Sequence, residues 1–291
     1  MSEVLESAFA KLNLSLDIVG RLPDGYHEMK MVMQSVALCD DVRIRLREDD
    51  SVTAKCDLRY LPCDDRNLAV RAARSFLKAA GLVGTGVDIE LKKRIPVCAG
   101  LGGGSSDAAA VLRGLNRLTG AGMDEKQLCE IGFTLGSDVP FCIAGGTVLA
   151  RGKGEKLTEL PPVPECHIVI CKPGFSISTP ELFSQIRCER IRCRPDTDGL
   201  IGSIGAGDVR GIARRLYNVF EDVLPKKYAG ISDVRSRLMD CGALGVAMSG
   251  TGSAVFGIYE SSDRAAAAYE ILRSEYRDCF LTKTVKKLDI V

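Results

Sequence analysis

The chain has 291 residues, of which 46% are hydrophobic and 26% are charged, and its formal net charge at pH 7 is +1. This composition is that of an ordinary globular protein with one large or two ordinary domains. The small net charge and the shortness of every apolar run, against the ~20 residues of a membrane span, argue against nucleic-acid binding and membrane insertion. The first ten residues are acidic and polar without a signal-peptide pattern. We therefore expect a cytoplasmic protein with no nucleic-acid or membrane partner.

Twelve cysteines are scattered along the chain, and no two of them form a C-x-x-C pair. Only two histidines, His27 and His167, are available to join them in a metal site. The ligand spacing of a structural zinc site is therefore missing. Cysteines such as Cys142 and Cys171 lie within apolar runs, where a thiol packs as a small hydrophobic group. We expect free thiols in a reducing compartment.

Residues 7–19 alternate between apolar and polar side chains, which predicts a strand. One face holds Leu12, Leu14, Leu16 and Ile18, and the other holds Lys11, Asn13, Ser15 and Asp17. By residue type alone, Lys11 is expected on a solvated strand face. A turn over 20–28, centred on Pro-Asp-Gly, then leads to strands over 31–38 and 41–46.

A helix is predicted over 68–80, where Gly81 ends it, and a strand over 87–91. The glycine-rich stretch 96–106 follows and opens onto a second helix, because apolar residues recur at helical spacing after it. Ser105 or Ser106 is the expected N-cap of this helix, and Asp107 would place a negative charge in its first turn.

Four glycines stand within the five positions 100–104. Glycine has no side chain to bury, whereas a glycine loop before a helix lets backbone N–H groups approach an anion closely. The stretch therefore predicts a phosphate-binding loop, and the alternative is a flexible surface turn. It lacks the Gly-Lys-Ser/Thr end of a Walker A loop. It also lacks the acidic residue that a dinucleotide fingerprint places at a following strand end.

Residues 123–135 are predicted to form a helix capped by Asp124, and Asp138 follows in a segment where an Asp is usually a turn residue. A strand over 145–150 then breaks into the glycine-rich residues 151–154. Three prolines over 161–164 mark the clearest linker of the chain. We place the domain boundary there, with one domain over 1–160 and another over 161–291.

The second half again mixes strands and helices. The Arg- and Gly-rich residues 187–211 are expected to be a solvated insertion with no assigned function. A strand–glycine turn–strand unit over 245–256 is a second place where the backbone must approach something closely. The other expected elements are a strand over 167–171, a loop over 172–180, helices over 181–183, 212–222, 231–240 and 262–276, and a strand over 282–285.

Three separated motifs together resemble those of the GHMP kinases, the family of galactokinase, homoserine kinase and mevalonate kinase. They are the Lys11-Leu12-Asn13-Leu14 strand, the 96–106 loop with its P-x-x-x-G-L-G-x-S/G-S pattern, and Ser249-Gly250-Thr251-Gly252. Segments within 20–28, 135–141 and 172–180 are similar to the branch of this family that phosphorylates a cytidine-diphosphate-linked methylerythritol. The resemblance spans 10–256 and departs from the family at Cys98-Ala99, where relatives are glycine-rich, and over 187–211.

The resemblance implies an α+β, two-domain fold. Its N-terminal part would be a mixed α/β domain with a left-handed crossover, and its C-terminal part a ferredoxin-like domain. The implied activity is ATP-dependent phosphorylation of the 2-hydroxyl of the cytidylated substrate, in the non-mevalonate route to isoprenoid precursors. The implied partners are ATP with Mg²⁺ and this small molecule, and the expected assembly is a monomer or weak homodimer.

The same resemblance assigns residues to these roles. Asp138 takes the position of the catalytic base, and Lys11 that of the residue that orients it and polarises the hydroxyl. The residues assigned to binding of the ATP phosphates are Pro96, Val97, Cys98, Ala99, Gly100, Leu101, Gly102, Gly103, Gly104, Ser105 and Ser106. The residues assigned to binding of the phosphoryl acceptor are Asn13, Tyr26, His27, Thr179, Phe183, Gly250 and Thr251. Ser106 is the one candidate named as a ligand of Mg²⁺.

Two other functions stay open at this point. Another GHMP kinase, of the homoserine or mevalonate type, is disfavoured by Tyr26 and His27. An inactive paralogue that binds ATP and regulates a partner is disfavoured by the presence of both Lys11 and Asp138. For Tyr26 and Phe183, a role as core aromatics is the alternative to contact with the cytosine.

Overall fold

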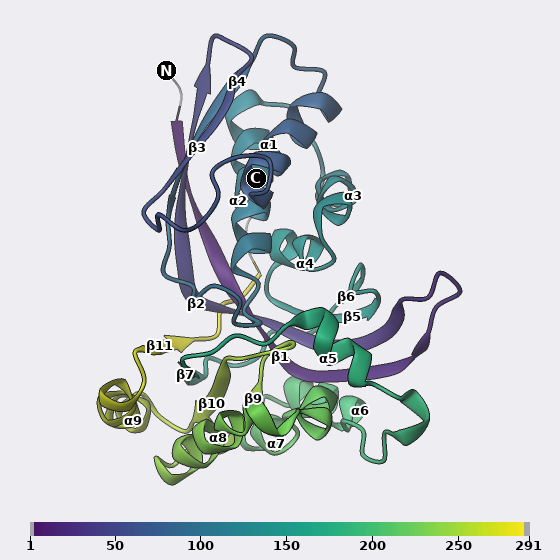
Figure 1. Cartoon of the computed structure of the whole chain (residues 1–291), viewed down its shortest axis with the longest axis vertical. Coiled ribbons are helices and arrows are strands. Elements are labelled where there is room, and N and C mark those ends of the chain that lie inside the picture. Colours follow the sequence, from purple (N-terminus) through teal and green to yellow (C-terminus); the bar gives the residue numbers. More distant parts are fainter. Residues whose placement is uncertain (1–2, 288–291) are drawn as a thin grey trace.

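The chain folds into two lobes that share one long hairpin (Figure 1). The computed structural model describes residues 3–287. The hairpin strands are β1 (Glu3–Arg21) and β2 (His27–Arg47), which pair antiparallel on either side of the predicted turn. Both strands run from the upper lobe of Figure 1 down to the lower lobe. Among the helices of residues 3–287, none combines the length and the apolar character needed to cross a bilayer.

A seven-stranded sheet builds the upper lobe, with helices covering one of its faces (Figure 1). Its order is β3-β4-β2-β1-β8, and β5 pairs with both β2 and β6. The parallel neighbours β3 and β4 are joined through α1, which makes this connection a crossover. The remaining bounds are β3 (Val52–Cys56), β4 (Gly86–Lys92), β5 (Thr147–Gly152), β6 (Lys156–Glu159), α1 (Leu68–Ala79), α2 (Gly103–Thr119), α3 (Glu125–Leu135) and α4 (Val139–Ala144).

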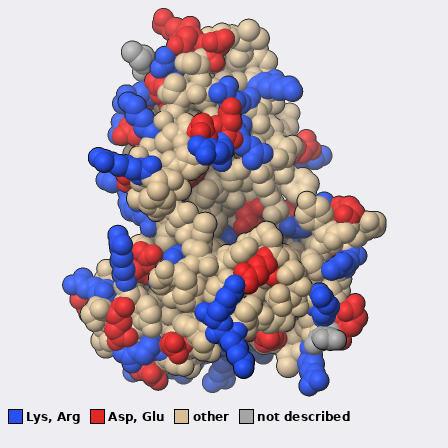
Figure 2. Space-filling view, in the orientation of Figure 1, with Lys and Arg blue, Asp and Glu red and all other residues tan. Residues whose placement is uncertain are grey.

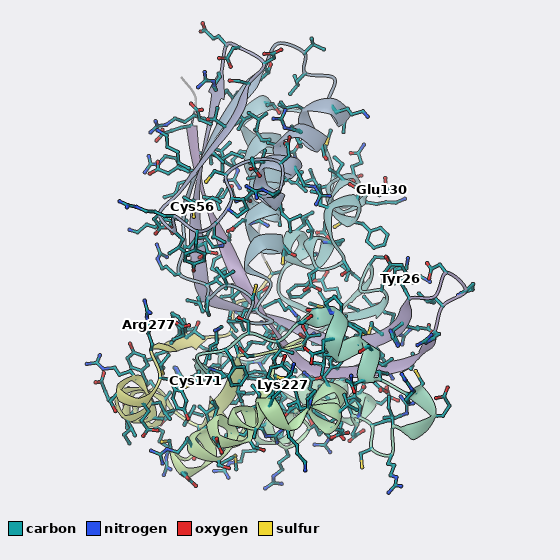
Figure 3. All side chains as sticks on the ribbon, in the orientation of Figure 1. Tyr26, Cys56, Glu130, Cys171, Lys227 and Arg277 are labelled. Carbon is teal, nitrogen blue, oxygen red and sulfur yellow. The ribbon has the colours of Figure 1, made fainter. Side chains whose placement is uncertain are left out.

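The lower lobe is built on an antiparallel four-stranded sheet of order β11-β7-β10-β9. With α8 before β9 and α9 between β10 and β11, this is the ferredoxin-like arrangement that the resemblance implied. The strands are β7 (His167–Lys172), β9 (Gly245–Met248), β10 (Val255–Tyr259) and β11 (Asp278–Lys283), and the helices are α8 (Gly230–Asp240) and α9 (Ser262–Glu275). The twelve cysteines of both lobes are free thiols, and Figure 3 labels Cys56 in the upper lobe and Cys171 in the lower one.

The stretch predicted as a solvated insertion is instead folded into the lower lobe. Leu200 and Ile204 are buried there, so this Arg-rich stretch also makes apolar contacts. The predicted helix over 212–222 is also wrong, because it divides into three short elements. The elements here are α5 (Thr179–Gln185), η1 (Cys188–Arg190), α6 (Thr197–Gly205), α7 (Val209–Arg214), β8 (Tyr217–Asn218), η2 (Val219–Val223) and η3 (Lys226–Tyr228).

Strand β1 is buried on both faces in its central part, which corrects the predicted solvated face. Lys11 is only 4% exposed and Asn13 is fully buried. A register shift between Asn13 and Ser15 also turns the strand, so that Leu12 and Leu14 pack with the lower lobe while Leu16 joins the other apolar cluster. Parallel pairing of β8 with Ser15 and Leu16 covers the strand further. The predicted boundary at 160/161 stays a prediction.

The start of α2 and the extent of β2 also differ from expectation. The N-cap of α2 is Gly102, which has φ 71°, and neither Ser105 nor Ser106 caps the helix because both lie inside it. The two strands predicted over 31–38 and 41–46 are one strand, because a register shift near Phe9 and Ala10 absorbs the irregularity between them. The predicted cap of α3 is confirmed, since Asp124 accepts from the backbone N–H of Gln127.

Candidate active site

Lys11 and Asp138 face each other at the junction of the two lobes. The Lys11 Nζ atom lies 3.5 Å from Asp138 Oδ2 and donates a hydrogen bond of 2.7 Å to Asn13 Oδ1. Asp138 is the residue that precedes α4, and its side chain makes no capping bond to that helix. Its carboxylate is 32% exposed while the Lys11 side chain is 5% exposed. The Lys11 ammonium is therefore buried, whereas the Asp138 carboxylate beside it is partly exposed to solvent.

The three sequence motifs converge on this pair. The backbone N–H of Lys11 donates to the Leu101 carbonyl at 3.0 Å, and the Ser249 hydroxyl donates to the Gly100 carbonyl at 2.9 Å. Gly100 has φ 77°, and a Cβ there would lie 2.0 Å from the Ser249 carbonyl oxygen. Only glycine fits this approach. The first strand, the glycine loop and the third turn are therefore held together by one backbone hydrogen bond, one from the Ser249 hydroxyl, and the close backbone approach at Gly100.

The glycine loop lines a cavity of about 630 Å³ that reaches from Pro62 to Thr179 and includes every residue from Ile95 to Ser105. The loop runs into the N-terminus of α2, whose first N–H groups have no partner within the helix. A Cβ at Gly104 would meet only Leu68 Cδ1, at 3.7 Å, so the space beside it is open. An anion such as a phosphate group can therefore approach the helix N-terminus closely.

Ser106, the residue suggested as a ligand of Mg²⁺, lies at the contact between α2 and β1. Its hydroxyl donates to the Phe9 carbonyl at 2.6 Å, and the residue is 2% exposed. The Asp107 Oδ2 atom lies 2.5 Å from Lys93 Nζ, whereas its Oδ1 atom is buried without a hydrogen-bond partner among the described residues. Between residues 3 and 287 there is no cluster of three or more His, Cys, Asp or Glu side chains placed to hold a metal ion.

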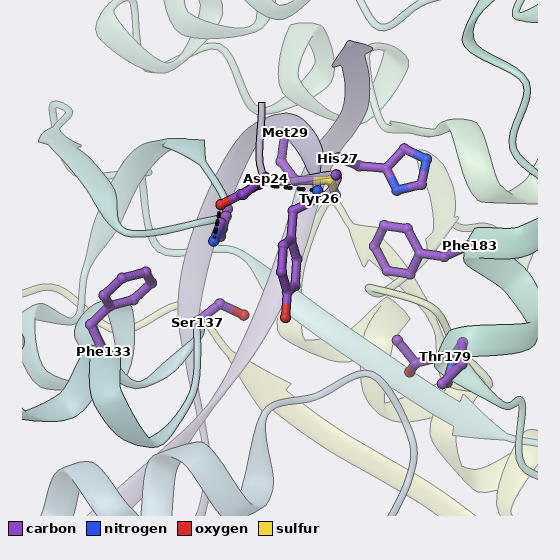
Figure 4. A pocket seen from close by; sticks show the side chains of 11 residues that line it. Asp24, Tyr26, His27, Met29, Phe133, Ser137, Thr179 and Phe183 are labelled. Carbon is purple, nitrogen blue, oxygen red and sulfur yellow. Dashed lines mark hydrogen bonds and ion pairs between the residues drawn. The ribbon is translucent and has the colours of Figure 1, made fainter. Parts of the chain in front are cut away.

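A second cavity, of about 670 Å³, is lined by aromatic side chains (Figure 4). The rings of His27 and Phe183 lie 5.2 Å apart, and Tyr26 projects into the cavity across from them. Tyr26 is 63% exposed, which rules out the alternative that it is a core residue. The His27 Nε2 atom is buried and has no hydrogen-bond partner in the described part of the chain. Burial lowers the pKa of His27, and the nearby charge of Arg21 lowers it further.

A third cavity, of about 480 Å³, connects the other two and contains the Lys11–Asp138 pair. Figure 2 shows the hollow between the lobes, with both acidic and basic side chains inside it. Thr179, Gly250 and Thr251 line this cavity, and the two threonine hydroxyls are 2.8 Å apart. Asn13 does not line it, because it is fully buried behind Lys11. Its predicted contact with substrate is therefore replaced by a bond to Lys11.

Sequence reasoning missed Lys153 and Asn218. Lys153 Nζ lies 2.6 Å from Asp24 Oδ2 and 4.1 Å from the centre of the Tyr26 ring, and it lines both the aromatic and the connecting cavity. The only feature of the local sequence that could have indicated a role for Lys153 is the pair of glycines that flank it. The Asn218 amide donates to the carbonyls of Met248 at 2.7 Å and Gly250 at 2.8 Å, and so shapes the third turn. Nothing in the local sequence indicates that contact.

The chain is similar to proteins of a known family. The profile described as "GHMP kinases N terminal domain" matches residues 67–146, and "GHMP kinases C terminal" matches 200–278. The chain is 44% identical to a 4-diphosphocytidyl-2-C-methyl-D-erythritol kinase of Acetivibrio thermocellus, over 98% of this chain and 100% of that protein. It is 40% identical to a protein of the same name from Alkaliphilus metalliredigens, over 99% of this chain and 98% of that one.

Solved structures agree with these matches. A crystal structure of 4-(cytidine 5'-diphospho)-2C-methyl-D-erythritol kinase is similar with TM-score 0.81 and 36% identity, covering 97% of this chain and 99% of that one. A homoserine kinase from Cytophaga hutchinsonii shares the fold, with TM-score 0.74 at 21% identity, covering 99% of this chain and 96% of that one.

Proposed function

Because the chain belongs to the GHMP kinases, and within them to the 4-diphosphocytidyl-2-C-methyl-D-erythritol kinases, we propose that it transfers the γ-phosphoryl group of ATP to the 2-hydroxyl of 4-diphosphocytidyl-2-C-methyl-D-erythritol. It is thus a kinase of the non-mevalonate pathway of isoprenoid precursor biosynthesis. The observation that carries the residue-level proposal is the position of the Lys11–Asp138 pair, in the cavity between the glycine loop and the aromatic site.

Phosphoryl transfer needs the attacking oxygen held in line with the leaving group, and its proton removed. We assign Asp138 to accept the proton of the substrate hydroxyl, since its carboxylate opens into the connecting cavity. The hydroxyl oxygen then bonds to the γ-phosphorus while the bond from that phosphorus to the β–γ bridging oxygen breaks, and ADP leaves. Lys11 keeps the carboxylate in place and faces the developing negative charge with a buried ammonium.

We assign the ATP phosphates to the glycine loop. Its support is the open space beside Gly104 and the free N–H groups at the N-terminus of α2, which favour a multiply charged anion. Mg²⁺ would come with the triphosphate and neutralise part of its charge. None of the steps assigned to Lys11 or Asp138 passes through that ion.

We assign the cytosine to the aromatic cavity. A planar base can stack between the Tyr26 ring and the His27–Phe183 pair, and the unpartnered His27 Nε2 atom can hydrogen-bond to the edge of the base. Lys153, at the boundary between the aromatic and connecting cavities, carries the positive charge that suits the diphosphate of the substrate. The free thiols are consistent with a cytoplasmic location, and the expected monomer or weak homodimer stays a prediction.

The test is turnover with ATP and each of three acceptors: the cytidylated methylerythritol, homoserine and mevalonate. We expect ADP release and a phosphorylated product only with the cytidylated acceptor. A higher kcat/KM with homoserine or mevalonate would overturn the substrate assignment. Tight ATP binding without turnover on any of the three would favour the regulatory alternative instead.

A further inference from the structure

Arg113 is a buried charged residue in the middle of α2 that none of the roles above uses. It is 2% exposed, and its Nη1 donates to the Cys142 carbonyl at 2.7 Å. Its Nη2 donates to the Ser7 carbonyl at 3.1 Å, and its Nε lies 3.4 Å from Glu6 Oε2. A buried guanidinium is costly unless it is paired, and each of the three Arg113 nitrogens has a partner here.

The two backbone groups that Arg113 binds belong to the two elements that carry the Lys11–Asp138 pair. Ser7 lies on β1, the strand of Lys11, and Cys142 lies in α4, the helix that follows Asp138. The Cys142 N–H also donates to the Asp138 carbonyl at 3.1 Å, so the Cys142 carbonyl is one helical turn from Asp138. Arg113 thus ties β1 and α4 together.

Helix α4 cannot hold its own position. It has six residues, far below the length at which a helix is stable alone, and its last carbonyls have no partners within the helix. Arg113 satisfies one of these carbonyls. Asp138 itself makes no capping bond that would anchor it to the helix. The place of the Asp138 carboxylate therefore depends on the contacts that hold α4, which are the packing of its six buried side chains and the bond from Arg113.

We propose that Arg113 is a positioning residue for phosphoryl transfer, which fixes α4 against β1 and thereby the approach of Asp138 to Lys11. This inference rests on the proposed roles of those two residues. A displacement of about 1 Å at a reacting group can lower a rate ~100-fold, so a loosened α4 should lower kcat. The glycine loop precedes Arg113 on the same helix and is held by other contacts, so ATP binding should not change.

Arg117 provides a matched control. It lies on the same helix one turn later and binds the other oxygen of the same carboxylate, Glu6 Oε1, at 2.8 Å. Its side chain is 44% exposed and no contact joins it to Ser7 or Cys142 in the described residues. An Arg117→Met variant therefore disturbs the Glu6 ion pair without releasing α4.

The experiment measures kcat and the KM for ATP in Arg113→Lys, in a Glu6→Gln/Arg113→Met double variant and in Arg117→Met. The double variant removes both buried charges and so leaves no unpaired charge in the core. We expect kcat to fall about 10- to 100-fold in both Arg113 variants, with the KM for ATP within about twofold of wild type. Arg117→Met should keep wild-type kcat.

A second measurement separates this inference from the roles of the catalytic pair. If Arg113 acts through Asp138, Arg113→Lys should lower kcat much less in an Asp138→Asn background than in the wild type. An equal loss in both backgrounds, or wild-type kcat in a folded Arg113 variant, would overturn the inference. So would failure of both Arg113 variants to fold, which would make the residue one of stability alone. Full turnover by Asp138→Asn itself would instead refute the proposed function.

Discussion

Tyr26 gives the sharpest residue-scale prediction for the substrate. Stacking on an aromatic ring stabilises a bound base by about 1–3 kcal/mol, so Tyr26→Ala should raise the KM for the cytidylated substrate about 5- to 100-fold. The KM for ATP should stay nearly unchanged, because the ring does not line the cavity of the glycine loop. Steady-state kinetics with one substrate saturating gives both values. Tyr269→Ala, on α9 of the lower lobe, is the control, and equal damage to both KM values would remove Tyr26 from the base site.

His27 yields a pH prediction. Burial and the Arg21 charge hold its pKa below the ordinary 6.5, so the ring is neutral near pH 7 in the folded protein. The unfolded chain binds a proton more readily than the fold does. The contribution of this ring to stability is therefore complete above the ordinary pKa and is lost as pH falls through the folded one.

NMR titration can measure this pKa directly, because the chain has only two histidines. A His27→Asn variant assigns the resonances. We expect a midpoint below 6.5 that moves lower still when cytidine diphosphate binds, since a neutral ring is needed to accept a hydrogen bond from the base. A midpoint at or above 6.5 would show that the ring is not desolvated as the structure has it.

The sequence could predict the residues whose roles follow from a local pattern. Lys11, Asp138 and Tyr26 stand in motifs, and the structure places all three around connected cavities. Lys153 and Arg113 could not be predicted, because their roles come from contacts with Asp24 and with the Cys142 carbonyl that only the fold creates. Ser106 stays a prediction as a ligand of Mg²⁺, and its hydroxyl donates to the backbone of β1, a contact that the motif did not indicate.

At the scale of elements, hydrophobic periodicity located most helices and strands but not their interruptions. It could not show that β2 continues past a register shift, because a shift disturbs the alternation that marks a strand. It also failed over 187–211, where short helices bury only a few apolar residues each. Short elements carry too few residues to display a period, so their structure is decided by packing against the rest of the lobe.

The glycine loop yields an element-scale prediction at Gly104. A Cβ there has only Leu68 within 4 Å, and a side chain built on it would occupy the space where we propose that phosphate approaches the N-terminus of α2. We expect Gly104→Val to lower ATP affinity at least about 10-fold while the melting temperature stays near wild type, because valine is no worse than glycine in a helix. Gly103→Val would be less clean, since its Cβ would already lie 3.2 Å from Ile95.

The matched control is Gly202→Val, which lies in α6 with open space around it. Calorimetric titration with ATP measures the affinity of both variants. If Gly104→Val is folded and binds ATP as the wild type does, the glycine loop is not the phosphate site.

At the scale of the whole molecule, the last described residues cross back from the lower lobe to the upper one. The Val285 N–H donates to the Ser35 carbonyl at 2.9 Å, and the Gln34 side chain donates to the Val285 carbonyl at 2.7 Å. Further on, Lys287 forms a bridge with Gly145, next to α4. The lobes are therefore linked by this segment as well as by β1 and β2. The sequence shows a proline-rich linker between the two halves, but this linker does not indicate that the end of the chain crosses back to the upper lobe.

Ending the chain after Lys283 should loosen this link. Each buried backbone hydrogen bond contributes about 0.5–1.5 kcal/mol net, so we expect the free energy of unfolding to fall by roughly 1–3 kcal/mol. Denaturant unfolding followed by circular dichroism measures the change. Lys287→Ala keeps the backbone path and loses only exposed ion pairs, so it should behave like the wild type. Wild-type stability in the shortened chain would show that the crossing segment does not join the lobes energetically.

The central claim is that Asp138 and Lys11 act together on the hydroxyl of the acceptor. Asparagine has nearly the shape of aspartate but cannot accept the proton, so Asp138→Asn removes the base. Because the Asp138 side chain makes no capping bond, the substitution takes no cap from α4. Turnover under saturating substrates should fall about 10²- to 10⁴-fold in Asp138→Asn and in Lys11→Met. The double variant should lose far less than the product of the two, with ATP affinity preserved in all three. Turnover close to wild type in a folded Asp138→Asn variant would contradict the account.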